Sequence, residues 1–395
     1  MRFTVRYEDV AFDTIGELPA EASSVRFFRG CEHSNGYVDA HCAAILKSLG
    51  AWPGAEPCAA PELARESRVS PERFAEFEWL FKKLAHGGYA GESPPGSWRA
   101  IGAPPEATGS LRAEVLAEEP AMAPALGLID AAAEGWPAFL RGENDGVSVL
   151  FNPRTLAFWD GYFSNRNPSY FALNALAAHA AARILPKKPL RVLEVGGGLG
   201  SGAEAFLEVL ESSENGGSGG PSRVASYVFT DISPGLLRRG ADKLRERFPS
   251  APIDPRPLDL NRPLTVQKVA AGSFDLVFAV NTLHVVKDLV FSLRELRQAL
   301  VPGGRIVLGE ATRPSRGEPL YFEFVFGLLR EFREFTADPE CRPYGGFLES
   351  RLWRAALEKA GFEKIWSLPD MEKALRAYRG FYMAGITAQK PIEAP

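Results

Sequence analysis

The chain has little of several features that mark particular classes of protein. It carries 45 Lys and Arg against 49 Asp and Glu, which gives a net charge of −4 at pH 7, so there is no basic excess to neutralise nucleic-acid phosphates. No apolar run approaches the length of a membrane span. The opening residues, MRFTVRYEDVAF, lack the apolar core of a signal peptide. We therefore expect a cytoplasmic protein that binds neither nucleic acid nor a membrane.

Cysteine is also scarce, with four residues in the chain. They are Cys31, Cys42, Cys58 and Cys341. No two of them form a CxxC pair, which is typical of reduced thiols rather than of a disulfide scaffold or a zinc site. His33 and His41 each stand close to a cysteine, but the spacings Cys-x-His and His-Cys are not those of usual zinc ligands. We expect no metal.

The length and the change in sequence pattern along the chain indicate two domains. A chain of 395 residues exceeds what a single hydrophobic core usually supports. Residues 1–150 are rich in Ala, Pro and Glu and show helical periodicity, with helices expected over 37–49, 71–86 and 121–140. This half is predicted to be a mainly helical, winged-helix-like domain, followed by a second domain over residues 151–395.

The second half alternates strands with helices, which predicts a parallel sheet covered by helices on both faces. Leu190–Val195 and Phe274–Val280 are nearly continuous apolar runs of the kind found in buried parallel strands. Val224–Thr230 and Arg305–Leu308 are further expected strands, the last beginning after a turn at Pro302-Gly-Gly304. Ligands of such sheets bind outside the carboxyl ends of the strands, so the residues there are the candidates for a site.

A glycine-rich loop, Gly196-Gly-Gly-Leu-Gly200, follows the first of these strands and precedes a helix. Glycines let a ligand approach the backbone, and the start of the helix offers free N–H groups. The loop, with Gly196 and Gly198 as its candidate contacts, fits either a dinucleotide or S-adenosylmethionine. Glu194 favours S-adenosylmethionine, since a carboxylate there attracts the ammonium of a methionine moiety and repels a pyrophosphate.

A second acidic anchor, Asp231, ends the next strand and is expected at the same edge of the sheet. Its carboxylate can accept hydrogen bonds from both ribose hydroxyls, with Ile232 beside it; the alternative is a helix cap before Ile-Ser-Pro. Its separation from the loop exceeds the usual ~20 residues, and a Gly/Ser-rich insertion over 211–222 accounts for the excess. Asp259 and Leu260 are candidates to contact the adenine, or to form a plain turn.

Four segments together resemble the class I methyltransferases, and most of all the methyltransferase domains of polyketide and nonribosomal peptide synthases. The segments are LEVGGGLG, FTDISPGLL, FDLVFAVNTLHVVKDL and LRQALVPGGRIVLGE. The resemblance implies a Rossmann-like α/β core with a mostly parallel seven-stranded sheet, and a helical lid or substrate domain at the N-terminus. It also implies S-adenosylmethionine as cofactor, with S-adenosylhomocysteine as product. Gly197 and Leu199 depart from the Ala and Thr that the family usually carries.

His284 and Glu310 are the candidate catalytic residues. His284 follows Asn281, a candidate cofactor contact, just after a strand, and Glu310 ends the neighbouring strand. An imidazole is a suitable base near neutral pH, and a carboxylate beside it orients the ring and stabilises its charged form. The resemblance implies the same His–Glu pair. The alternative for a lone histidine is a purely structural role.

Aromatic residues supply candidates for the substrate side of the site. The segment Tyr321–Phe326 is expected to be an aromatic helix in which Tyr321, Phe322 and Phe326 line an acceptor pocket or, equally, pack in the core. Tyr162 lies in FWDGYFSNRNPSY, which resembles the segment that closes over the cofactor. A plain helix-entry turn at Asn167-Pro168 is the alternative there.

These observations predict a methyltransferase of polyketide or peptide natural-product biosynthesis, acting on a small-molecule or carrier-bound acceptor. Oxygen methylation is favoured, because the chain has the form of a freestanding enzyme with a variable N-terminal unit. Carbon methylation at the α-position of a β-ketoacyl thioester is the nearest alternative, since the same His–Glu pair serves either. Glu194 disfavours a nicotinamide oxidoreductase, and the pair of His284 and Glu310 disfavours a cyclase that keeps the fold without methylating.

Overall fold

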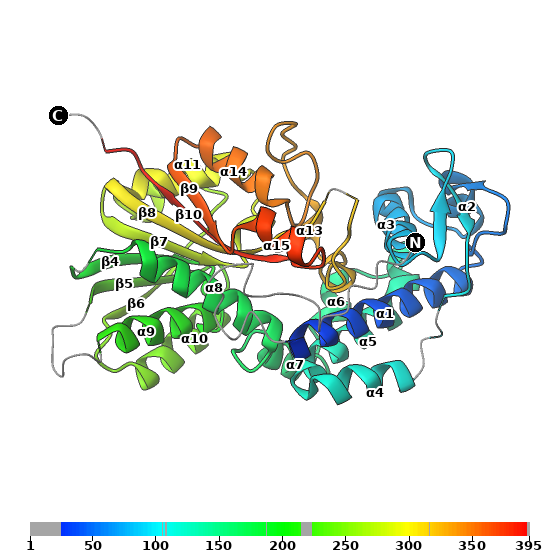
Figure 1. Ribbon diagram of the computed structural model, residues 1–395, viewed down its shortest axis with the longest axis horizontal. Coiled ribbons are helices and arrows are strands. Elements are labelled where there is room, and N and C mark those ends of the chain that lie inside the picture. The colour runs from blue at the N-terminus through cyan, green and yellow to red at the C-terminus, as the bar shows by residue number, and fades with distance from the viewer. Residues whose placement is uncertain are drawn as a thin grey trace. The chain divides into compact units, whose positions relative to one another are not determined.

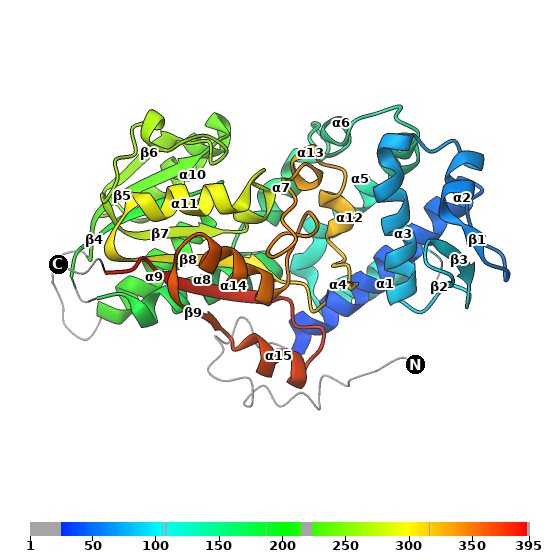
Figure 2. The same cartoon turned by 90° about the horizontal axis from the view of Figure 1, so that it is seen from above.

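A computed structural model describes residues 25–104, 106, 109–186, 188–214, 223–315 and 317–392 of the chain. The described residues divide into two compact units (Figures 1 and 2). Unit 1 comprises residues 25–162 and 315–333, and unit 2 comprises residues 163–314 and 334–392. Each unit is described by itself below. The domain boundary at residue 150 stays a prediction from the sequence.

Unit 2 is built on a seven-stranded sheet with the strand order β6-β5-β4-β7-β8-β10-β9. The strands are β4 (Leu190–Val195), β5 (Val224–Asp231), β6 (Ile253–Pro257), β7 (Phe274–Val280), β8 (Leu300–Ala311), β9 (Glu363–Leu368) and β10 (Met383–Gln389). The first five strands of this order run parallel, and β10 is antiparallel to both β8 and β9. The mostly parallel sheet with its helices is the α/β fold that the sequence predicted.

Helices cover both faces of this sheet, as Figure 1 shows. The helices α8 (Pro168–Ile184), α9 (Ser201–Glu214) and α10 (Pro234–Arg247) lie on one face, and α11 (Leu289–Ala299) and α14 (Ser350–Lys359) lie on the other. A short helix, α15 (Met371–Ala377), precedes β10. The alanine-rich α8 packs very closely, because a Cβ at Gly385 of β10 would lie 2.5 Å from the Leu176 carbonyl oxygen. Small side chains on both partners therefore set this helix–sheet spacing.

Most strand boundaries in unit 2 follow the apolar runs of the sequence. The predictions for β4 and β7 are confirmed residue for residue. The predicted start of β8 at Arg305 is wrong, because the strand begins at Leu300. Leu300 pairs with Phe274 and Arg305 pairs with Leu276, so the Pro-Gly-Gly segment forms a bulge within the strand instead of a turn before it. Of the predicted insertion over 211–222, residues 215–222 lie outside the described part of the chain.

Unit 1 is mainly helical and contains a small antiparallel sheet with the order β1-β3-β2. Its strands are β1 (Cys58–Ala59), β2 (Ala90–Glu92) and β3 (Ser97–Ala100). Its helices are α1 (Val25–Ser48), α2 (Ala60–Glu66), α3 (Phe74–His86), α4 (Gly109–Glu118), α5 (Ala123–Leu140), α6 (Gly146–Leu150), α7 (Leu156–Tyr162), α12 (Glu323–Phe326) and α13 (Arg330–Arg333). The expected aromatic helix over 321–326 is shorter than predicted, since Tyr321 and Phe322 precede α12.

The segment 315–333 belongs to unit 1 although it follows the parallel strands of unit 2 in the sequence. The Trp136 Nε1–H donates to the Phe324 carbonyl oxygen at 2.9 Å, and the Trp79 Nε1–H donates to the Glu323 carboxylate at 3.2 Å. Arg333 forms an ion pair with Glu76 at 3.1 Å. The buried Trp136 indole, the half-buried Trp79 indole and one ion pair therefore attach this segment to α3 and α5.

Membrane-spanning helices and metal-binding clusters are both absent from the described residues. None of the helices in this part of the chain is long and apolar enough to cross a membrane. Among the same residues, no group of three or more His, Cys, Asp or Glu side chains is arranged to hold a metal ion.

Helix α10 offers a test of how tightly it packs on the glycine-rich loop. A Cβ at Gly240 would lie 2.5 Å from the Gly198 carbonyl oxygen and 2.9 Å from the Phe229 ring, whereas a Cβ at Gly235 meets no atom within 4 Å. We expect Gly240→Ala to lower the free energy of unfolding by about 1–3 kcal/mol through overpacking. Gly235→Ala is the matched control and should be neutral or stabilising by about 0.5 kcal/mol. Urea denaturation measures both; equal stabilities would contradict the close packing.

Candidate active site

The carboxyl ends of the central strands of unit 2 bring the candidate residues to one edge of the sheet. Val195 of β4 pairs with Ala279 of β7, and Val280 of β7 pairs with Gly309 of β8. The glycine loop, Asn281 and Glu310 therefore begin next to one another on three adjacent parallel strands. This is the position at which parallel α/β sheets bind their ligands.

The glycine-rich loop is held by the neighbouring strand β5. The Gly197 N–H donates to the Thr230 carbonyl oxygen at 2.8 Å, and the Gly198 N–H donates to Asp231 Oδ2 at 2.9 Å. Gly196 and Gly198 have φ angles of +64° and +54°, which only glycine adopts without strain in most settings. The loop turns sharply as a result; a Cβ at Gly198 would meet no atom within 4 Å, whereas a Cβ at Gly196 would collide with the Thr282 side chain.

Asp231 lies at the end of β5, two residues before Ser233, which is the N-cap of α10; its contact with ribose stays a prediction. Its Oδ2 accepts from the Gly198 N–H, and its Oδ1 accepts from the Ser233 N–H at 2.7 Å, next to the start of α10. Burial raises the pKa of this carboxyl above its ordinary value, and the backbone N–H donors partly offset that effect. A carboxylate oxygen accepts more than one hydrogen bond, so ribose hydroxyls and these backbone groups do not exclude one another.

Glu194 is 1% exposed and is the penultimate residue of β4, just before the loop. The Tyr227 hydroxyl donates to its Oε2 at 2.9 Å. Burial raises the pKa of the Glu194 carboxyl from 4.5 to about 8, against the effect of the tyrosine hydrogen bond. A ligand ammonium that binds beside this buried carboxyl would stabilise its ionised form.

The remaining candidates for the adenine side are Ile232, Asp259 and Leu260. Ile232 is 66% exposed beside Asp231, which leaves an apolar surface at the strand end. Asp259 follows β6, and its Oδ1 accepts from the Asn261 N–H at 2.9 Å, as in a turn. Leu260 is buried, and its carbonyl oxygen accepts from the Ser292 hydroxyl at 2.9 Å. Contact with a cofactor stays a prediction for all three.

His284 and Glu310 form a buried pair. His284 lies in a short 3₁₀ turn, η7 (Leu283–Val285), and its Nδ1 is 2.8 Å from Glu310 Oε2. Their side chains are 4% and 0% exposed. The other oxygen of Glu310, Oε1, accepts from the Thr282 N–H at 3.2 Å and from the Leu283 N–H at 2.9 Å. Both carboxylate oxygens are thus engaged, which fixes the plane of the carboxylate and directs the imidazole.

The segment before His284 joins this pair to the glycine loop. The Thr282 hydroxyl donates to the Gly196 carbonyl oxygen at 3.2 Å, while the Thr282 N–H donates to Glu310. Asn281 has a φ of +53°, an uncommon conformation for a residue other than glycine. Such conformations concentrate at functional sites, where neighbouring contacts hold them. The Asn281 N–H donates to the Gly309 carbonyl oxygen at 2.7 Å, which is one such contact.

Sequence reasoning missed three residues that organise this edge. Tyr227 donates to Glu194 from within a strand, and the Thr230 hydroxyl donates to the Glu194 carbonyl oxygen at 2.7 Å. Thr282 lies within the Asn281–His284 motif, and its hydroxyl joins that motif to the Gly196 carbonyl oxygen of the glycine loop. The sequence of β5 gives no sign of the roles of Tyr227 and Thr230, because buried Tyr and Thr are common in strands for packing alone.

The aromatic candidates lie in unit 1, where they pack with one another. The Tyr162 ring is edge-on to the Trp159 ring at 5.8 Å and to the Phe326 ring at 5.9 Å. Tyr321 and Phe322 are buried with their rings 5.1 Å apart. These contacts describe a core cluster of unit 1. The predicted cofactor contact of Tyr162 and the predicted pocket stay predictions.

The strand order, the glycine loop and the acidic strand ends are those of a class I methyltransferase fold. Residues 193–306 match the family described as a methyltransferase domain, a range that contains the loop, Asp231 and His284.

Within this class the chain resembles the methyltransferase domains of polyketide synthases. It is 32% identical to highly reducing polyketide synthase 2 of Gibberella zeae over 250 residues, which covers 62% of this chain and 9% of that protein. The structure of the CurJ carbon methyltransferase is 25% identical with a TM-score of 0.72, and the match covers 96% of each chain. The trans-methyltransferase CalH, solved as a complex with SAH, shares the fold at 21% identity and a TM-score of 0.58, over 91% of this chain and 90% of that one. This chain thus spans only about a tenth of the matched synthase.

The buried Glu194 predicts how stability changes with pH. Its pKa of about 8 in the folded protein exceeds the ordinary 4.5, so the folded state holds a proton that the unfolded state releases between these values. Stability contributed by this proton is therefore lost as pH rises through that window. We expect Glu194→Gln to raise the free energy of unfolding at pH 8 by a few kcal/mol and to change it little at pH 5. Urea denaturation at both pH values measures this, with the exposed Glu211→Gln as control; no pH-dependent gain would contradict it.

Proposed function

We propose that the protein transfers a methyl group from S-adenosylmethionine to the α-carbon of a β-ketoacyl thioester of polyketide type. In this proposal His284 is the general base and Glu310 orients it. The observation that carries the proposal is the buried pair of the His284 imidazole and the Glu310 carboxylate, 2.8 Å apart, beside a methyltransferase glycine loop. The acceptor is a small molecule or an acyl group on a carrier protein.

The cofactor would be held by the loop and the two buried carboxyls. Glu194 is placed to receive the ammonium of the methionine part, since its desolvated carboxyl has no cation among the described residues. Asp231 would accept from the ribose hydroxyls, and Gly196 and Gly198 leave room for the backbone to approach the ligand. Ile232, Asp259, Leu260, Asn281 and Tyr162 are proposed to complete the site. When bound, S-adenosylmethionine supplies a methyl group activated on a sulfonium sulfur.

The chemical task of the protein is then to position the acceptor and to remove its proton. Because Nδ1 of His284 is bound to Glu310, the imidazole would accept the α-proton at Nε2. The charge that develops on the ring is stabilised by the Glu310 carboxylate, which the two backbone N–H groups hold in place. The electron pair left on the acceptor carbon would form the bond to the methyl group that the bound cofactor supplies, and the former bonding pair would stay with the cofactor.

We prefer carbon to oxygen as the acceptor atom because the chain is similar to a carbon methyltransferase of known structure. The CurJ carbon methyltransferase matches this chain over 96% of its length at 25% identity. The expectation of oxygen methylation rested on the form of a freestanding chain and has no comparable support. Removal of the α-proton gives an enolate that is nucleophilic at carbon and at oxygen, so oxygen methylation of the same acceptor is the outcome that the product analysis must separate.

The base assignment predicts a selective loss of turnover. His284→Ala should lower kcat by about 10²–10⁴, the usual contribution of a general base, while the affinity for S-adenosylmethionine stays close to wild type. His179→Ala, on the half-buried face of α8, is the matched control and should keep full activity. Steady-state kinetics with a β-ketoacyl thioester measures kcat, and calorimetry measures cofactor affinity. Normal turnover of His284→Ala would remove the histidine from the mechanism.

The position of the new methyl group distinguishes carbon from oxygen. We expect mass spectrometry to show a gain of one methyl, and NMR of the hydrolysed product to place it on the α-carbon. The same enzyme without cofactor should exchange the α-proton for deuterium, because proton removal comes before methyl transfer. A methyl ether in the product would replace carbon methylation by oxygen methylation. Absence of any methylated thioester would overturn the acceptor class.

Glu194 predicts a proton linkage on cofactor binding. With a pKa of about 8, its carboxyl is mainly protonated at pH 7 before the cofactor binds. An ammonium nearby favours the ionised form, so binding at pH 7 should release a proton and should strengthen as pH rises towards 8. Calorimetry in buffers of different ionisation enthalpy counts the released protons. Glu194→Gln should bind more weakly and release none; equal proton release by the variant would place the linkage elsewhere.

A further inference from the structure

The carbonyl groups of the His284 turn are bound by a buried arginine from much later in the chain. Arg342 Nη2 donates to the His284 carbonyl oxygen at 2.9 Å, and Nη1 donates to the Val286 carbonyl oxygen at 2.5 Å. The turn has weak hydrogen bonds of its own, since the Val285 and Val286 N–H groups reach their acceptors at 3.3 and 3.4 Å. The arginine therefore supplies the shortest bonds that these backbone carbonyls receive.

The burial of Arg342 lowers the stability of the fold. It is 1% exposed, and no carboxylate among the described residues lies within ion-pair distance of its guanidinium. Its Nε–H has no hydrogen-bond partner there either, and burial lowers its pKa to about 10. The charges of Asp288 and Glu310 partly offset this effect, but a buried cation without a carboxylate in direct contact is destabilising compared with an apolar side chain of similar volume. The rigid two-armed guanidinium, however, is well suited to two neighbouring carbonyl oxygens.

The loop over residues 334–349, which carries Arg342, also covers the imidazole itself. The Phe347 ring lies 4.4 Å from the His284 ring, tilted by 30°. The Thr336 N–H donates to the Lys287 carbonyl oxygen at 2.7 Å, just beyond the turn. One loop thus contacts the ring of His284, its carbonyl oxygen and the residues that follow it.

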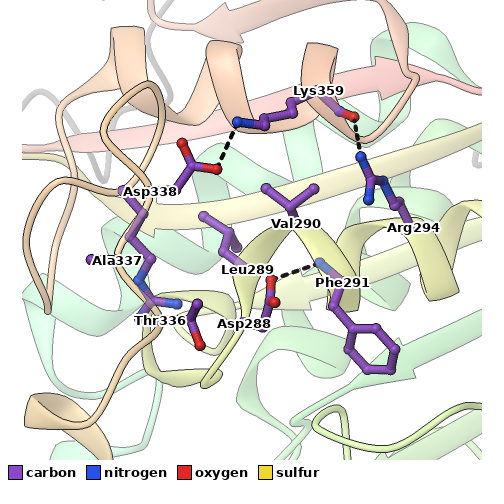
Figure 3. Close-up of a pocket in the computed structure, with 10 residues that line it drawn as sticks. Asp288, Leu289, Val290, Phe291, Arg294, Thr336, Ala337, Asp338 and Lys359 are labelled. Atoms are coloured by element: carbon purple, nitrogen blue, oxygen red, sulfur yellow. Dashed lines mark hydrogen bonds and ion pairs between the residues drawn. The ribbon is translucent and has the colours of Figure 1, made fainter.

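The loop is itself attached to the helices of unit 2. Asp338 and Arg342 exchange two backbone hydrogen bonds of 3.0 and 2.7 Å. The Asp338 carboxylate receives Lys359 of α14 at 2.8 Å, an ion pair that Figure 3 shows. A cavity of about 340 Å³ lies between this loop and the start of α11, and Arg342, Asp288 and Arg294 are among its lining residues. Arg342 therefore stands between the catalytic turn and a cavity large enough for small ions.

We propose that Arg342 is a positioning residue for methyl transfer, which holds the His284 backbone so that the imidazole meets the acceptor proton. The inference rests on the proposed role of His284 as the base. Glu310 orients the ring through Nδ1, and Arg342 holds the carbonyl side of the same short turn. The base lies on a 3₁₀ helix of three residues, so both contacts are needed to hold it in place. A shift of about 1 Å in a reacting group lowers the rate by up to about 10²-fold.

The test uses Arg342→Lys and Arg342→Ala in the full chain. Arg342→Lys keeps the charge but cannot bind both carbonyls with the same geometry, so kcat should fall by about tenfold while KM and cofactor affinity remain near wild type. Arg342→Ala should lose more of its kcat, and guanidinium at millimolar concentration should restore part of it by occupying the vacated site through the cavity. Wild-type kcat in Arg342→Lys would overturn the proposal.

Two controls separate this inference from a structural role and from the proposed function. Arg294→Ala removes another arginine of the same cavity, which donates to the Lys359 carbonyl oxygen and not to the turn; its kcat should stay at wild type and should not respond to guanidinium. A fall in kcat of Arg342→Ala that guanidinium does not relieve, with a matching fall in melting temperature and cofactor affinity, would make the residue structural only. If Arg342→Ala fails to fold, the kcat of Arg342→Lys decides.

Full turnover of His284→Ala would overturn the proposed function. If His284→Ala loses turnover but Arg342→Lys keeps full turnover, this inference alone is overturned.

Discussion

The geometry of this edge of the sheet depends on the buried carboxylate of Glu310. One of its oxygens faces the His284 imidazole, and the other accepts two backbone N–H groups of the segment after β7. A carboxylate that is 0% exposed is costly unless its hydrogen-bonding capacity is filled. Its partners therefore have little freedom to move. Through Thr282, which also donates to the Gly196 carbonyl oxygen, the same carboxylate is coupled to the glycine loop.

The two other buried acids of this edge differ in how they are satisfied. Asp231 receives backbone N–H groups from the loop and from the start of α10, so it ties two segments to β5. Glu194 accepts from the Tyr227 hydroxyl and from the Ala203 N–H, yet burial raises the pKa of its carboxyl to about 8. An acid left in this state lowers the stability of the folded protein as pH rises from about 4.5 to about 8. Such a local cost is typical of a residue kept for binding, since a cation removes the cost when it arrives.

The His284 turn illustrates how a short element gains a defined position. Three residues of 3₁₀ helix have few hydrogen bonds of their own, and here those bonds are long. Side chains from two distant parts of the chain, Glu310 and Arg342, supply the rest from β8 and from the loop before α14. Phe347 packs against the imidazole from that same loop. The position of the ring thus depends on tertiary contacts, and the order of the parallel strands only brings it to the correct edge.

The sequence alone determined the class of fold and the edge of the sheet at which the candidate residues meet. Continuous apolar runs predicted β4 and β7, and the rule that parallel strands end together placed Glu194, Asp231, His284 and Glu310 at one edge. Local patterns carry this information because strand burial and glycine conformation are properties of short segments. The bulge in β8, the assignment of residues 315–333 to unit 1 and the hydrogen bonds from Arg342 to the His284 turn were decided by the tertiary structure. Each arises from pairing between residues far apart in the chain, for which a single sequence holds no local signal.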